Sequence, residues 1–322
     1  MRAWKSRIGR CDNMAWLTNS EFLELIRICE IEIVLNIASA LRKRNNAVKI
    51  IEIGAGAGWQ ARQLSEAGYE VEAIDLEQGY YSNDRVWPVR DYDGKHIPFA
   101  DDSFDIVFSS SALEHIPHLT HFQNEMKRVL KPNGIAIHIV PSGSWRLWTN
   151  LTHYPYVFGR VLDVMRTPRH NGHGEAQGHA GEQKRRSRRS GLIMKALFPT
   201  RHGERGTALS ELYEFSRFKW SAVFMRSGWK IERVIPNRLF YTGYLVFGSY
   251  LSISLRKYVS YVLGSSCHVF VLKKANLFDD MTELFGPVKR SLSPCSVLGR
   301  SRRRKIPHAI TDLNRRRIRL PY

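Results

Sequence analysis

The chain has 322 residues, of which 43% are hydrophobic and 25% are charged, and its formal net charge at pH 7 is +19. This length and composition suit one large or two small globular domains and exclude a collagen-like or wholly disordered chain. The four cysteines are widely scattered, and the first sixteen residues lack the apolar core of a signal peptide. We therefore expect free thiols and a cytoplasmic protein.

The positive charge is concentrated in two segments. Residues 184–189 contain five basic residues, and residues 286–322 contain eleven basic residues against one acidic residue. We expect the tail, residues 275–322, to be solvated and disordered. It could instead make weak contact with an anionic membrane, which would place the protein at the membrane periphery, or with nucleic acid.

The N-terminal part, residues 1–45, is predicted to be a helical cap. Thr18 and Glu21 have the spacing of a capping box, and apolar residues recur at helical spacing over residues 18–43. This pattern predicts one helix, or two, lying against the rest of the fold.

A strand, a glycine turn, a helix and a second strand follow. Residues 48–53 are rich in β-branched side chains, residues 54–58 contain three glycines, residues 59–67 have a helical pattern, and residues 70–76 form a strand pattern with Asp75 near its end. This is a βαβ unit, which predicts parallel strands.

The alternation continues with a strand at 104–108, a helix at 120–130, a turn at 131–134 and a strand at 135–140. Residues 46–141 are therefore predicted to form the core of a doubly wound, mostly parallel α/β sheet.

Beyond this core the pattern is less regular. We expect residues 142–210 to be an insertion that is helical at 145–163 and partly disordered at 170–190, and that covers an acceptor. Residues 211–274 then supply a helix at 211–227 and strands at 229–236 and 266–272. The uncharged stretch 239–255 is interrupted by glycines and hydroxyl side chains, so we interpret it as buried strand and loop rather than a membrane span.

The glycine turn indicates a nucleotide-type ligand. In parallel sheets such ligands bind at the C-terminal ends of the strands, where glycines let the backbone approach them closely. The dinucleotide fingerprint requires Gly or Ala five residues after the first glycine, but this position is Trp59. Hydride-transfer enzymes are therefore disfavoured.

The segment Glu52-Ile53-Gly54-Ala55-Gly56-Ala57-Gly58 resembles the first motif of the class I S-adenosylmethionine-dependent methyltransferases. The resemblance continues at residues 73–76, 93–105, 110–116 and 128–134, so it covers about residues 48–141. It is closest to the methyltransferases that act on small molecules.

This resemblance implies a Rossmann-like sheet of seven strands and S-adenosylmethionine as the cofactor. It implies that the glycines contact the methionine half, that Asp75 binds the ribose hydroxyls, that Asp93 binds the adenine amine, and that residues 109–111 lie near the sulfonium. The cofactor residues that it implies are Glu52, Gly54, Ala55, Gly56, Gly58, Asp75, Leu76, Asp93, Gly94, Ser109 and Ser110.

Methyl transfer from a sulfonium requires in-line positioning and, for a hydroxyl acceptor, removal of a proton. His115, beside Glu114 and after the fourth predicted strand, is the first candidate for this base, and packing against the adenosine pocket is the alternative. Similar enzymes of ubiquinone biosynthesis hold a metal with a Glu-His pair and a further Glu, but that further position is Ser111 here. We therefore expect no metal, and we interpret the histidines between 170 and 179 as a solvated loop.

Several polar and aromatic residues after the core are candidates to line the acceptor pocket: Trp145, Trp148, His153, Tyr154, His202, Gly203, Glu204 and Glu211. We predict transfer to oxygen or nitrogen of a small molecule or a saccharide, which could be lipid-linked. The alternatives are an RNA methyltransferase that uses the basic segments, and a cofactor-binding protein without catalysis.

Overall fold

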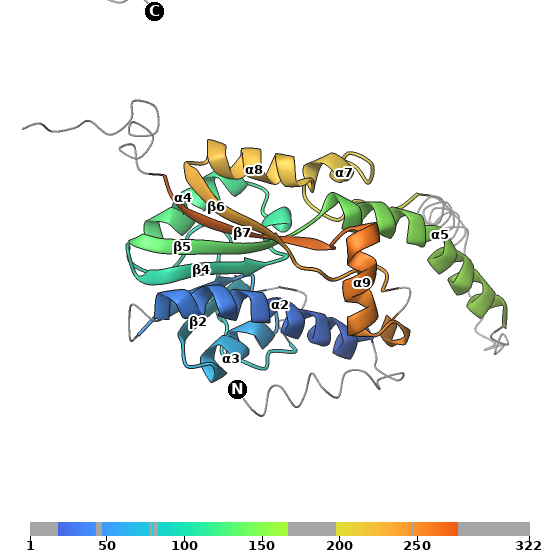
Figure 1. The fold of residues 1–322 in the computed structure, drawn as a ribbon, viewed down its shortest axis with the longest axis horizontal. Coiled ribbons are helices and arrows are strands. Elements are labelled where there is room, and N and C mark those ends of the chain that lie inside the picture. The colour runs from blue at the N-terminus through green and yellow to red at the C-terminus, as the bar shows by residue number, and fades with distance from the viewer. Residues whose placement is uncertain are drawn as a thin grey trace, which may run out of the picture. The chain divides into compact units, whose positions relative to one another are not determined.

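The computed structural model describes residues 19–42, 47–77, 79, 83–166, 198–245 and 248–275. Over these ranges the chain forms a seven-stranded sheet in the order β3-β2-β1-β4-β5-β7-β6 (Figure 1). The strands are β1 (Lys49–Ile53), β2 (Glu70–Leu76), β3 (Arg90–Tyr92), β4 (Phe104–Ser110), β5 (Leu130–Pro141), β6 (Trp229–Pro236) and β7 (Cys267–Lys274).

The sheet is mixed but mostly parallel. Strands β3, β2, β1, β4 and β5 run parallel, and β7 lies antiparallel between β5 and β6. The C-terminal ends of the five parallel strands therefore meet at one edge, as the βαβ pattern predicts. The expected Rossmann-like, seven-stranded methyltransferase fold is confirmed.

Helices cover both faces of the sheet. Figure 1 shows α2 and α3 on one face and α4 and α8 on the other. The helical elements are α2 (Asn19–Arg42), α3 (Trp59–Glu66), η2 (Leu113–His115), α4 (Leu119–Val129), α5 (Gly143–Arg166), α7 (Glu211–Glu214), α8 (Arg217–Arg226), η3 (Gly248–Tyr250) and α9 (Ile253–Leu263).

The core lies around the central strands. Every residue of β4 is buried, and so are the last eight residues of β5, as expected for parallel strands covered on both faces. Helix α2 contributes Phe22, Ile26 and Val34 to the same core, at the helical spacing seen in the sequence. Its predicted helix is confirmed as one continuous element, whereas Thr18 of the capping box lies outside the described residues.

Two predicted boundaries are wrong. Residues 131–134 were expected as a separate turn, but β5 begins at Leu130 and contains them. The pairing shifts between Phe104–Leu130 and Ile106–Ile135, so these residues bulge from the strand instead of ending it. The single helix expected at 211–227 is two helices, because Ser216 caps α8 with its side chain and interrupts the run.

Residues 239–255 were expected to be buried strand and loop, but the structure has no strand among the residues that it describes there. Leu239, Phe240 and Tyr241 are buried, but they lie in an irregular segment that leads to η3 and then to α9, which the sequence analysis missed. The short edge strand β3 was also missed. Among the described helices, none is long and apolar enough to cross a membrane. The predictions for residues 170–190 and for both basic segments lie outside the described residues.

Candidate active site

The glycine turn after β1 has a backbone that other residues rarely adopt. Gly54, Gly56 and Gly58 all have positive φ angles, of 70°, 56° and 81°. A Cβ atom on Gly54 would lie 2.5 Å from the Cβ of Ala112, and one on Gly58 would lie 2.6 Å from the Cβ of Trp87. The absence of side chains therefore permits both the turn and its close packing.

The turn is fastened to the end of β2. The amides of Gly54 and Ala55 both donate to the carbonyl of Ile74. Asp75 Oδ2 accepts a hydrogen bond from the amide of Gly56, and its Oδ1 accepts one from Leu76. The acid predicted for the ribose hydroxyls thus also holds the glycine turn in place.

Glu52 is buried one residue before the end of β1. Burial, together with the negative charge of nearby Asp75, raises the pKa of its carboxyl to about 8. No described residue makes a hydrogen bond to its Oε2. A buried polar atom in this position has capacity for a ligand group that donates a hydrogen bond.

Leu76 and Gly94 face one another where β2 and β3 end. A Cβ atom on Gly94 would lie 2.9 Å from the Cδ2 of Leu76, so a side chain at position 94 would clash with Leu76. Asp93, by contrast, is engaged by its own loop, because it accepts hydrogen bonds from the amides of Lys95 and His96. These bonds hold the pKa of its exposed carboxyl well below the usual range.

The serines at the end of β4 have different partners. Ser109 is buried, and its Oγ lies 2.8 Å from Nδ1 of His138 on β5. Ser110 Oγ accepts a hydrogen bond of 3.2 Å from Arg27. Ser111 follows with a positive φ of 50°, an uncommon backbone for a residue other than glycine.

Arg27 was not predicted to belong to this region. Its guanidinium pairs with buried Glu30 at 2.7 Å, and Glu30 also accepts hydrogen bonds from Asn237 and Tyr241. The network attaches α2 to the end of β4 and to the segment after β6. A lone arginine within an amphipathic helix gave no sequence signal for this contact.

Glu114 and His115 come from η2, immediately after β4. The Glu114 side chain is fully buried, and burial raises the pKa of its carboxyl to about 7. His115 Nε2 lies 3.9 Å from Glu114 Oε1, and burial lowers the pKa of the imidazole. The two candidate catalytic residues are therefore adjacent, with the imidazole more exposed than the carboxylate.

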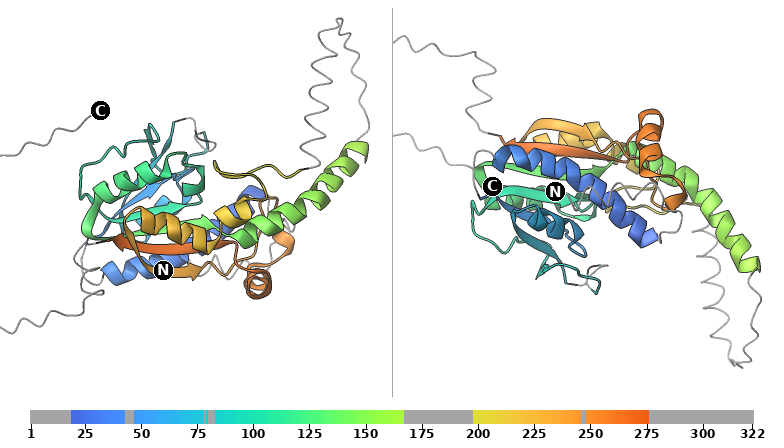
Figure 2. Two further views of the ribbon diagram at one scale, coloured as in Figure 1. Left: turned by 90° about the horizontal axis from the view of Figure 1, so that it is seen from above. Right: turned by 60° about the horizontal axis from the view of Figure 1, so that its bottom comes forward.

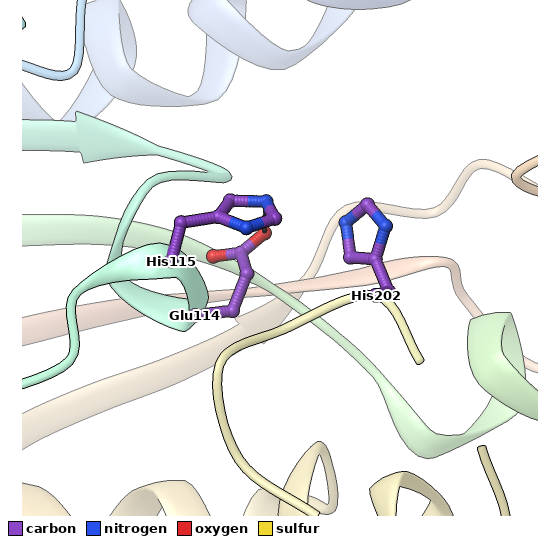
Figure 3. Close-up of side chains that lie close together, drawn as sticks. All are labelled: Glu114, His115 and His202. Atoms are coloured by element: carbon purple, nitrogen blue, oxygen red, sulfur yellow. Dashed lines mark ion pairs between the residues drawn. The ribbon is translucent and has the colours of Figure 1, made fainter. Parts of the chain in front are cut away.

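His202 joins this pair from a distant segment. Its ring centroid lies 4.8 Å from that of His115 and 4.7 Å from that of Trp145. Burial, and secondarily His115, lowers its pKa to about 4. Figure 3 shows the side chains of Glu114, His115 and His202 gathered around one space. These three residues have ligand atoms within 4.8 Å of one another and could hold a metal ion.

A buried ion pair supports the His202 segment. Glu211 accepts hydrogen bonds from the amides of His202 and Gly203, and it pairs with Arg146 Nε at 2.8 Å. The amide of Glu204 donates to the carbonyl of Glu114. Glu211 therefore positions the segment rather than lining an open pocket.

The other residues that were predicted to line the acceptor pocket lie at different positions along α5 and have different partners. Trp145 contacts His202, whereas Trp148 donates to the carbonyl of Leu263 and His153 bonds to Tyr244. Tyr154 is exposed. A small pocket beside the His202 segment is lined by Glu114, Gly203, Arg205, Glu214, Phe215, Trp220 and Val223.

Comparison with known proteins agrees with this geometry. Residues 51–138 match the family model of a methyltransferase domain. These residues form a class I S-adenosylmethionine-dependent methyltransferase domain. The match spans the glycine turn, both predicted acids and the Glu114–His115 pair, so the motifs quoted from the sequence lie inside the methyltransferase domain.

Relatives of the methyltransferase domain cover only part of the chain. The chain is 31% identical over 119 residues to a biotin biosynthesis bifunctional protein of Cellvibrio japonicus, covering 34% of the chain and 24% of that protein. It is 32% identical over 136 residues to an uncharacterized methyltransferase of Mycobacterium leprae, covering 38% and 48%. The chain thus spans about half the length, or less, of these relatives. A crystal structure of an S-adenosylmethionine-dependent methyltransferase from Aquifex aeolicus aligns at 15% identity with a TM-score of 0.40, covering 80% of this chain and 98% of that one.

The cofactor of this family fits the residues present. The glycines at 54, 56 and 58 leave backbone without side chains at the end of β1, and Glu52 offers a buried oxygen without a described partner. Asp75 lies near the end of β2, and Asp93 directly follows the neighbouring parallel strand β3. A carboxylate is a suitable partner for a diol or for an amine donor, which agrees with the roles that the resemblance implies.

Proposed function

We propose that the chain transfers the methyl group of S-adenosylmethionine to an oxygen or nitrogen atom of a small molecule or saccharide, including lipid-linked acceptors. One observation carries this proposal: the cofactor turn packs directly against the segment that bears the polar pair. Gly54 lies against Ala112, two residues before Glu114. A cofactor on the turn and an acceptor beside Glu114 and His115 would therefore be neighbours.

The reaction requires positioning more than covalent participation by the protein. The cofactor supplies a methyl carbon that is already activated by the positive sulfur. The acceptor's lone pair forms the new bond in line, the electron pair of the broken carbon–sulfur bond stays on sulfur, and the acceptor's proton leaves. Glu114 and His115 are the side chains that we propose act on this proton.

The surface of α5 supports an acceptor attached to a lipid. Four apolar side chains repeat at spacings of four, three and four residues, which places them on one face of the helix. They are Leu147, Leu151, Tyr154 and Phe158, and each is between 43% and 65% exposed. Figure 2 shows α5 extending outward from the sheet, while Trp145 in its first turn contacts His202.

An anionic membrane is the surface that matches this helix. Apolar and aromatic side chains enter the interface between headgroups and acyl chains, and basic residues add electrostatic attraction to anionic lipids. The chain carries a formal net charge of +19. Contact along α5 would bring a lipid-linked acceptor to the end of the helix that adjoins His202.

The acceptor class is tested by incubating the full-length protein with methyl-labelled cofactor and a fractionated cell extract. We expect label in the glycan, lipid or small-metabolite fraction. At subsaturating cofactor we expect about 10- to 100-fold less label with the Asp75→Asn variant, which loses the ribose-binding charge. Glu66→Gln, on the exposed face of α3, is the matched control and should label normally. Label in RNA alone would overturn the proposed acceptor class, and absence of label from every fraction would contradict the transfer itself.

A further inference from the structure

We propose that Glu114, His115 and His202 form a binding site for one divalent transition-metal ion of the zinc type. Two imidazoles and one carboxylate are a ligand set that suits Zn²⁺, Co²⁺ or Fe²⁺. The donors come from two segments that are far apart in the chain, η2 and the loop before α7.

The carboxylate of Glu114 has no hydrogen-bond partner among the described residues, and its contact with His115 Nε2 is long, at 3.9 Å. Both of its oxygens are buried, and no described residue makes a hydrogen bond to either of them. Buried carboxylates in folded proteins are normally paired, hydrogen-bonded or bound to a metal. Arg27 and Arg205 lie near enough to act on Glu114 electrostatically, but neither donates a hydrogen bond to it, and the Arg27 guanidinium is already engaged by Glu30 and Ser110. A cation between the carboxylate and the imidazoles would satisfy these oxygens.

The third donor is held in place by a supporting structure. Both amides at His202 and Gly203 donate to Glu211, which is itself paired with Arg146. Gly203 has no side chain at a point where a Cβ would lie 3.0 Å from the Glu114 carbonyl. The segment can therefore lie directly against η2 and present His202 to it, as second-sphere residues do for metal-binding histidines.

The distances are compatible with binding after a small adjustment. The three ligand atoms lie within 4.8 Å of one another, and the His115–Glu114 distance is 3.9 Å. Two ligands on one zinc ion, each bonded at about 2.0–2.2 Å, can be at most about 4 Å apart. Neither histidine side chain is completely buried, so rotation of these side chains can bring the imidazoles closer while Glu114 stays fixed.

Three protein ligands leave a coordination position open, as in catalytic zinc sites. An acceptor hydroxyl bound there would have a lowered pKa and would lose its proton to solvent more readily. This role rests on the proposed methyl transfer, whereas the binding of the ion does not. Glu114, His115 and His202 would then promote loss of the acceptor's proton by holding the metal ion, and not by accepting the proton themselves.

The test titrates untagged full-length protein, treated with a chelator, with Co²⁺ and then with Zn²⁺. We expect one equivalent of Co²⁺ to give visible absorption bands of a low-symmetry site, and Zn²⁺ to abolish them by displacement. His115→Ala, His202→Ala and Glu114→Gln should each weaken Zn²⁺ binding at least tenfold. His121→Ala, an exposed histidine on α4, is the matched control and should bind as the wild type does.

Binding of S-adenosylhomocysteine is measured on the same variants. We expect it to be retained in His202→Ala, which separates the metal site from the cofactor site and confirms that this variant is folded. If the wild type binds the nucleoside but no Co²⁺, the metal site is refuted while the proposed function stands. Binding that is lost only when His170, His173 and His179 are replaced together would also overturn the assignment.

Discussion

His138 lies within β5 and is completely buried. Its Nδ1 faces Ser109, its ring stacks on Phe224, and burial lowers its pKa to about 3. The folded protein therefore keeps this imidazole neutral, whereas the unfolded chain takes up a proton near pH 6.5. A proton bound only by the unfolded state favours unfolding as the pH falls.

We predict that His138 by itself makes the free energy of unfolding rise with pH between about pH 3 and pH 6.5, by up to about 1.4 kcal/mol per pH unit. Glu52 and Glu114 act in the opposite direction, because burial raises the pKa values of their carboxyls in the folded protein. Denaturant titrations across this range measure the slope. In His138→Gln the change in the free energy of unfolding per pH unit should be smaller by the amount that corresponds to about one bound proton, whatever the variant's stability at pH 7. An unchanged slope in this variant, with the exposed His121→Gln as control, would contradict the assignment.

Residues within one motif could be predicted from the sequence, whereas partners from distant segments could not. The glycine turn and Asp75 are local, because a strand that ends in three glycines must turn and the next strand must end beside it. Arg27 and His202 reach the site only through tertiary packing. Asp93 is a position that the motif identifies, but its hydrogen bonds to Lys95 and His96 could not be read from the spacing.

At the scale of elements, the turn between β1 and α3 is the most constrained connection near the site. Its amides are bonded to the end of β2, and its first glycine lies against Ala112 after β4. One element thus joins three strand ends, so its shape sets the position of any ligand bound there. A side chain at Gly54 must disturb all three.

We predict that Gly54→Ala lowers the free energy of unfolding by about 2–4 kcal/mol, because the residue would have a left-handed backbone and would clash with Ala112. Gly159→Ala within α5 is the control, since a Cβ there meets nothing within 4 Å. That change should stabilise the helix by about 0.5–1 kcal/mol. Equal effects of the two changes in thermal or denaturant unfolding would contradict the packing described for the turn.

The elements that could be predicted from the sequence are those with a clear run of apolar residues or a regular spacing of them. The first five residues of β4 and the second half of β5 are mostly apolar, and α2 keeps its apolar residues at helical spacing. The helix α9 was missed because its exposed positions carry Leu255, Tyr258 and Val262, which removes the polar face that marks a surface helix. The break between α7 and α8 was missed because Ser216 caps a helix inside an otherwise helical run.

At the scale of the molecule, we propose that the parallel half of the sheet supplies the cofactor edge and that the later segments supply the acceptor side. The strand order brings β1 between β2 and β4, so the glycine turn lies next to both Asp75 and η2. The segment before α7 then returns to Glu114 and is fixed there by Glu204 and Glu211. The class of fold can be predicted from the alternation of strands and helices. The contact between the segment before α7 and Glu114 cannot be predicted in this way.

The central claim is that a sulfonium nucleoside binds where β1 turns into α3, and titration calorimetry with S-adenosylhomocysteine tests it most directly. We predict binding at one site per chain, weakened about 10- to 100-fold by Asp75→Asn, because a hydrogen bond to a charged group contributes about 1.5–3 kcal/mol. Glu66→Gln should bind as the wild type does. The claim is contradicted if folded wild-type protein gives no heat of binding, or if Asp75→Asn binds with unchanged affinity.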